Sequence, residues 1–174
     1  VRTRHALQTL GVFAQLRALT LGTIRDVASE HLARRVEEQG IEALHSILSG
    51  QQLCQLSYRL TERLQPLLPR LVKRFVVELL GCPSVVYIDS RPIVRLFVPH
   101  DVYHAHQALF AKRGPGWLQI HGPHRDTWFG HATTGIDMWM ALGRVLRGNG
   151  LLIYPGQWET ECIRDGRQRL SRAQ

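Results

Sequence analysis

The chain has 174 residues, of which 44% are hydrophobic and 21% are charged, and this composition is typical of one soluble globular domain, not of a disordered chain. The net charge of +8 comes mainly from scattered arginines, with Lys73 and Lys112 as the two lysines, which excludes the clustered basic tract of a typical nucleic-acid binder. No apolar run approaches the ~18 residues of a membrane span, and no signal-peptide pattern opens the chain. We therefore expect a cytoplasmic protein without nucleic-acid or membrane partners.

The three cysteines are widely spaced, at Cys54, Cys82 and Cys162. No Cys-x-x-Cys pair is present to hold zinc or to run redox chemistry. We interpret all three as reduced, buried thiols, which agrees with a reducing cytosol.

Residues 1–83 are predicted to form an N-terminal helical layer. Apolar side chains recur at near-helical spacing over residues 7–21, and Gly22 is predicted to end this first helix. Thr23 followed by Asp26 resembles a capping box, which predicts a second helix that ends at Gly40.

Two further helical stretches follow in the same layer. Residues 41–48 predict a short helix that ends at Ser49 and Gly50. Apolar positions keep helical phase again from residue 51 to residue 80. Pro66 and Pro69 must kink or divide this stretch, because each removes a backbone donor and crowds the preceding turn.

Residues 84–174 are predicted to form the β part of the same structural domain. The β-branched and aromatic residues of 85–88 and 93–98 predict the first strands, and prolines punctuate them. Arg95 lies in the second of these strands, either facing inward toward a carboxylate or solvated on an edge.

A polar cluster of His100, Asp101, His104 and His106 precedes the glycine-rich residues 112–116. His100 and His104 would share one face if this segment were helical. The cluster lacks a convincing further metal ligand, so we interpret it as a solvated connection near a substrate entrance.

The triplet His124-Arg125-Asp126 lies between two stretches of strand character, residues 117–120 and 136–142. A His-x-Asp pair near the end of a strand places an imidazole and a carboxylate on the same side of the backbone. These are two of the three ligands of a 2-His-1-carboxylate facial triad for non-heme Fe(II). Asn149 between two glycines predicts a hairpin turn, with residues 151–154 as the returning strand.

Three segments together resemble a known family. HGPHRDTWFGH at residues 121–131, GIDMWMALG at 135–143 and GNGLLIYPG at 148–156 resemble the phytanoyl-CoA dioxygenase-like branch of the Fe(II)/2-oxoglutarate-dependent oxygenases. The resemblance covers residues 94–158. It implies an α+β fold in which the helical layer packs on a double-stranded β-helix, the jelly-roll, cupin-like barrel.

The resemblance also implies an activity and a set of site residues. The expected cofactors are Fe(II) and 2-oxoglutarate, and O2 and a small metabolite, such as a natural-product intermediate, are the expected substrates. His124 and Asp126 would be metal ligands. Cofactor contacts are assigned to Trp139, Gln119 and Arg95, and the substrate pocket to Thr127, Trp128 and His131. Trp139 has an alternative role as a filler of the barrel core.

The third metal ligand has competing candidates. His121 and His131 flank the triplet, but the family takes its second histidine from a much later strand. Asp137 also departs from the family, whose members tend to carry a neutral amide at this place.

The chain departs from the family at its end as well. No histidine follows His131, so neither the distal ligand nor the arginine that binds 2-oxoglutarate can be assigned. We therefore expect that the C-terminal strands are missing and that the chain is a truncated stretch. The alternative hypothesis is a non-catalytic or incomplete relative that acts as an interaction module, and a basic nucleic-acid binder is the third.

Overall fold

A computed structural model describes the protein in two compact units. The first unit is Val1–Gln119 with Leu142–Arg144, and the second is Ile120–Ala141 with Val145–Gln174. Within them, the structure describes residues 11–74, 76, 81, 92–113, 117–118, 124–126, 131, 135, 137–154, 162–164 and 170–172.

The first unit begins with two helices, α2 (Val12–Val27) and α3 (Glu30–Gln39). The predicted end of the first helix at Gly22 is wrong, because α2 continues through it. Thr23 is fully buried there, and its hydroxyl donates a hydrogen bond of 2.7 Å to the Leu19 carbonyl. Ser29 caps α3 instead, accepting from the Leu32 N–H, and Gly40 ends it at φ 94° as predicted.

The chain then forms η1 (Ile41–Ala43), α4 (Leu44–Ile47), α5 (Gly50–Leu64), η2 (Gln65–Leu67) and α6 (Leu68–Lys73). A capping box between Ser49 and Gln52 starts α5. Pro66 and Pro69 lie in the first turns of η2 and α6, where a missing N–H costs little, and they divide the stretch as predicted.

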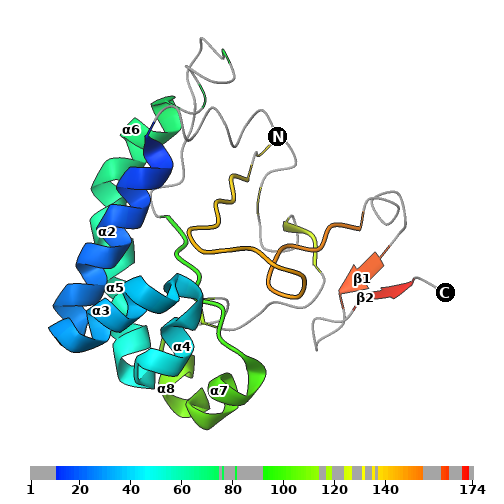
Figure 1. The fold of residues 1–174 in the computed structure, drawn as a ribbon. Helices are drawn as coiled ribbons and strands as arrows, with labels where there is room; N and C mark the ends of the chain where they lie inside the picture. The colour runs from blue at the N-terminus through cyan, green and yellow to red at the C-terminus, as the bar shows by residue number, and fades with distance from the viewer. Residues whose placement is uncertain are drawn as a thin grey trace. The chain divides into compact units, whose positions relative to one another are not determined.

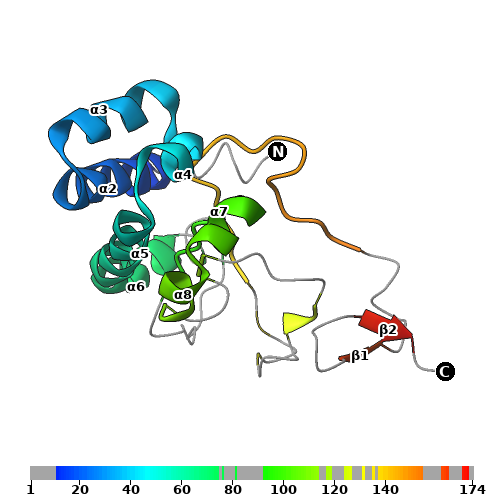
Figure 2. The same ribbon diagram turned by 90° about the horizontal axis from the view of Figure 1, so that it is seen from below.

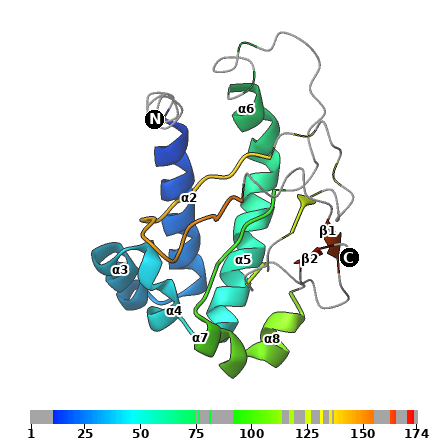
Figure 3. The same ribbon diagram turned by 90° about the vertical axis from the view of Figure 1, so that its right-hand side faces the viewer.

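Helices α2 and α5 pack side by side and run in opposite directions (Figure 1; Figure 3). The core between and around them includes Ile24, Val36, Leu53, Leu56 and Leu60, each at most 2% exposed. Burying one such side chain stabilises the fold by about 1.5–3 kcal/mol. This packing explains why Gly22 is tolerated inside α2, since a helical glycine costs only about 1 kcal/mol.

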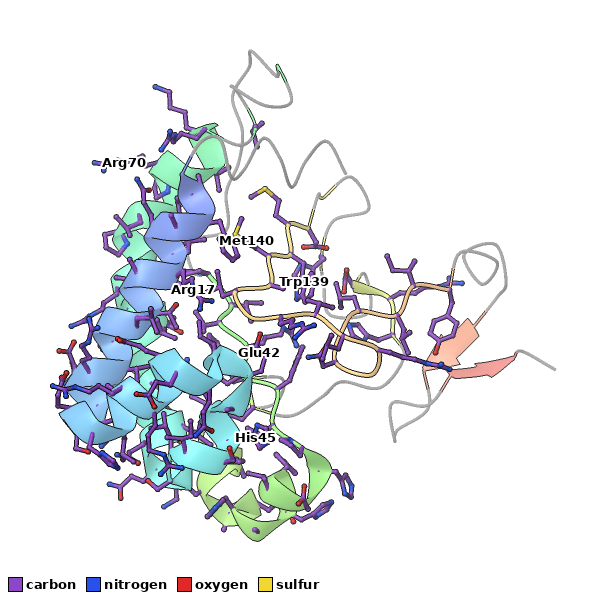
Figure 4. All side chains as sticks on the ribbon, viewed as in Figure 1. Arg17, Glu42, His45, Arg70, Trp139 and Met140 are labelled. Atoms are coloured by element: carbon purple, nitrogen blue, oxygen red, sulfur yellow. The ribbon has the colours of Figure 1, made fainter. Side chains whose placement is uncertain are left out.

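Polar contacts also fasten the two helices. Arg63 of α5 donates to the Thr23 hydroxyl at 3.1 Å and forms an ion pair with Asp26 of α2. The Leu142–Arg144 segment joins the same unit, because Arg17 donates to the Leu142 carbonyl and Glu42 accepts from the Arg144 N–H (Figure 4 labels Arg17 and Glu42).

The predicted strand at residues 93–98 is wrong. These residues are in no strand, and the Leu96 N–H donates one backbone hydrogen bond of 2.8 Å to the Trp117 carbonyl instead of entering a ladder. Val98 is 4% exposed in the core of the helical unit. Val94 and Leu96 also pack against this core, whereas Ile93 and Phe97 are exposed. Alternate side chains of a short apolar run can therefore be buried against helices as well as against a sheet.

Two short helices follow, α7 (His100–Ala105) and α8 (Gln107–Ala111). Figure 2 shows them beside α5, across from α2 and α3. Phe110 of α8 is 1% exposed and belongs to the same core as Leu53 and Leu56 of α5.

Arg113 follows α8 and lies between two aromatic rings. Its guanidinium carbon is 3.9 Å from the Tyr58 ring centroid and 3.7 Å from that of Trp117. The same guanidinium donates to the hydroxyls of Ser57 at 3.1 Å and Thr61 at 3.0 Å. It thereby joins the end of α8 to α5.

In the second unit, β1 (Cys162–Arg164) pairs antiparallel with β2 (Leu170–Arg172), with Cys162 opposite Arg172. A turn is present at Gly148, where φ is 99° and the Leu146 N–H donates a hydrogen bond to Asn149 Oδ1. Residues 151–154 form no returning strand.

The expected double-stranded β-helix is therefore wrong for the part of the chain that the structure describes. That part is mainly helical, and its sheet consists of two three-residue strands. A jelly roll needs two sheets whose strands satisfy one another's backbone groups, and neither 93–98 nor 137–142 is in such a ladder. The predicted strand at 85–88 lies outside the described residues. No helix among those described is both long and apolar enough to cross a bilayer.

Candidate functional site

The candidate site is centred on His124 and Asp126 in the second unit. His124 Nε2 lies 3.4 Å from Asp126 Oδ1, so the two side chains of the His-Arg-Asp triplet approach one another. The His124 side chain is 27% exposed and that of Asp126 is 53% exposed. Both groups are therefore accessible to an ion or a small molecule.

Asp137 adds a second carboxyl group to this pair. It is hydrogen-bonded to Asp126, and its pKa is raised above the ordinary value by partial desolvation, by that hydrogen bond and by the negative charge of Asp126. The charge of His131 acts in the opposite direction on the Asp137 pKa. When Asp137 is protonated it can donate a hydrogen bond to the Asp126 carboxylate, so the two acidic side chains can lie side by side without charge repulsion.

Residue-type reasoning missed Asp137 as a site residue. The signal was present, because a carboxylate stood where similar sequences carry a neutral amide. In the structure, Asp137 is paired with Asp126 through a hydrogen bond, and His131 is close enough to lower the Asp137 pKa electrostatically.

The remaining predicted site residues are divided between the two units and the residues outside the described ranges. Trp139 is in the second unit and 46% exposed, while Arg95 belongs to the first unit and is half-buried. Gln119, Thr127 and Trp128 lie outside the described residues, as does His121. Their assignments stay predictions.

The groups present fit a divalent metal in part. Imidazole nitrogen and carboxylate oxygen are the donor types of a non-heme iron site, and His124 with Asp126 supplies one of each. Over the described residues, however, no three His, Cys, Asp or Glu side chains are arranged to hold one ion. The pair therefore supplies two donor groups of the types that a metal centre uses, without a third among the described residues.

Comparison with known proteins adds no relative. No protein-family model, no curated protein and no solved structure matches this chain.

Proposed function

We propose that this protein is an Fe(II)- and 2-oxoglutarate-dependent oxygenase that oxidises a small metabolite with O2. The approach of His124 Nε2 to Asp126 Oδ1 carries the proposal, because it brings together the two donor types of such a centre. The resemblance of residues 121–131 to the phytanoyl-CoA dioxygenase-like oxygenases gives the pair its reaction class. When bound, iron and 2-oxoglutarate supply the oxidising chemistry.

In this proposal the chain's own residues bind the ion and control a proton. His124 and Asp126 are the ligands, and no third His, Cys, Asp or Glu side chain among the described residues is arranged to hold the ion with them. Asp137 donates its hydrogen bond to the same carboxylate that would bind the metal. A cation at Asp126 therefore competes with that hydrogen bond, so metal binding should favour loss of the Asp137 proton.

The proposed compartment is the cytoplasm. Cys54 is buried and is not in a disulfide. A reducing cytosol keeps such thiols reduced, which supports this location.

An anaerobic Fe2+ titration followed by calorimetry tests the site. His124→Ala and Asp126→Ala should each weaken binding by more than about 100-fold, since direct ligands cost more than the 10–100-fold typical of their outer partners. His31→Ala and Asp101→Asn are matched controls, because both side chains are exposed, on α3 and α7, and they should bind iron as the parent does. Equal affinity in all four variants would remove the metal site.

Succinate release tests the reaction class. The parent protein with Fe2+, O2 and 2-oxoglutarate should form succinate even without the metabolite, at a slow rate that Asp126→Ala abolishes. Iron binding without any succinate would leave a metal site and refute the oxygenase.

A second candidate function is an interaction module. The observation that favours it is an exposed apolar run in the second unit, where Leu151 and Tyr154 are 55% exposed and Leu152 and Ile153 are 81% exposed. A module predicts iron-free protein that self-associates or binds a partner. Light scattering should then show that the parent self-associates and that the double variant Leu152→Ser/Ile153→Ser does not.

A further inference from the structure

A pair of histidines on α7 lies outside the site described above. His100 Nε2 is 2.9 Å from His104 Nε2, and the ring centroids are 4.1 Å apart with planes inclined by 62°. The two residues are one helical turn apart, which places their side chains on one face of the helix. Both are exposed to solvent.

The separation of the two nitrogens matches a chelate. Zinc–imidazole bonds are about 2.0–2.1 Å long, so nitrogens at this separation subtend roughly 90° at a bound ion. That angle suits adjacent positions of a tetragonal or octahedral ion and needs only slight opening for a tetrahedral one. The contact between the rings can therefore be replaced by an ion without a change of helix register.

The helix that carries the pair is anchored to the core. The Tyr103 ring centroid lies 5.9 Å from that of the buried Phe110, which belongs to the core. The His106 ring packs against Phe110 and occupies the space where a side chain on Gly50 would lie. This third histidine is used in packing, and the other two are presented on a fixed support.

We propose that His100 and His104 form a two-imidazole chelate for Zn2+ or another imidazole-preferring transition-metal ion, with water completing the coordination. Imidazole ligands favour zinc, copper and nickel over magnesium or calcium. The site differs in donor type from the His124–Asp126 pair, which combines one nitrogen with one oxygen donor. The two sites can therefore be separated by metal and by variant.

Zn2+ titration of the whole chain by calorimetry tests the proposal. His100→Gln and His104→Gln keep the size and polarity of the side chain but replace the ligand, and each should weaken this zinc site by about 100-fold, the typical gain from a second linked contact. His31→Gln on α3 is the matched control and should leave the zinc affinity unchanged. Circular dichroism of each variant checks that the helices are intact.

Electron paramagnetic resonance of one bound Cu2+ gives a readout that folding alone does not change. The parent spectrum should show coupling to two imidazole nitrogens, each glutamine variant should show one, and His124→Ala/Asp126→Ala should still show two. Unchanged zinc affinity in both glutamine variants, or coupling to a single nitrogen in the parent, would overturn the chelate. Because the double variant removes only the proposed iron ligands, failure of one site leaves the other testable.

Discussion

Replacement of Arg113 should destabilise the helical unit more than replacement of any surface arginine. Its guanidinium is stacked between Tyr58 and Trp117, and each cation–π contact contributes about 0.5–2 kcal/mol depending on its exposure. The hydrogen bonds to Ser57, which is fully buried, and to Thr61 are lost as well. A hydrogen bond to a charged group contributes about 1.5–3 kcal/mol.

Since these contributions overlap, we expect Arg113→Ala to lower the free energy of unfolding by about 3–5 kcal/mol. Arg113→Lys should recover only part of this loss. An ammonium keeps the charge, but it cannot stack between two rings while donating in a fork to two hydroxyls.

Urea denaturation followed by circular dichroism measures the difference. Arg59→Ala is the matched control, because Arg59 is on the same helix as Ser57 and its ion pair with Glu62 is exposed, with side chains 65% and 66% exposed. Such a pair contributes at most about 1 kcal/mol. If Arg113→Ala and Arg59→Ala unfold at the same urea concentration, the stacked guanidinium does not stabilise the unit.

Three smaller perturbations test other parts of the structure. Ser49→Ala removes the side chain that caps α5 and accepts a hydrogen bond from the Gln52 N–H, so it should lower the free energy of unfolding by about 1 kcal/mol in the same urea denaturation. An unchanged free energy of unfolding would mean that the cap is unimportant. Burial raises the pKa of the Cys54 thiol and the Arg113 charge lowers it less, so Cys54 should react slowly with iodoacetamide at pH 8 in folded protein and rapidly in urea. Equal rates, read by mass spectrometry, would contradict its burial. The raised pKa of Asp137 means that the folded state favours its protonated form, a stabilisation that is present in acid and is lost as the pH rises through the folded-state pKa. Asp137→Asn should therefore match the parent in acid and be more stable near neutral pH, and the reverse order in pH-dependent unfolding would refute the shared hydrogen bond with Asp126.

Helical features with local causes were predictable from the residues. The end of α3 at Gly40, the break at Ser49 and the division near Pro66 all follow from one residue's backbone preference. The end predicted at Gly22 failed for a different reason. Burial of Thr23 and Ile24 in the core outweighs the preference of one glycine and the capping pattern beside it.

The candidate site was also only partly predictable. The spacing of His124 and Asp126 predicted that their side chains lie near each other, and the two are 3.4 Å apart, whereas their role as metal ligands stays a prediction. The contact of Asp137 with Asp126 joins residues from different segments, and no local pattern specifies it. The position of Arg113 between Tyr58 and Trp117 is of the same kind.

Apolar runs such as residues 93–98 and 151–154 show the limit most clearly. Their composition predicted strands, yet neither is in a ladder: the first buries Val98 in the helical core and exposes Ile93 and Phe97, and the second is exposed throughout. An α-helix closes its backbone hydrogen bonds within its own segment, so its residues specify it. A strand needs a partner from elsewhere in the chain, and only the folded arrangement of this protein settles which apolar segments receive one.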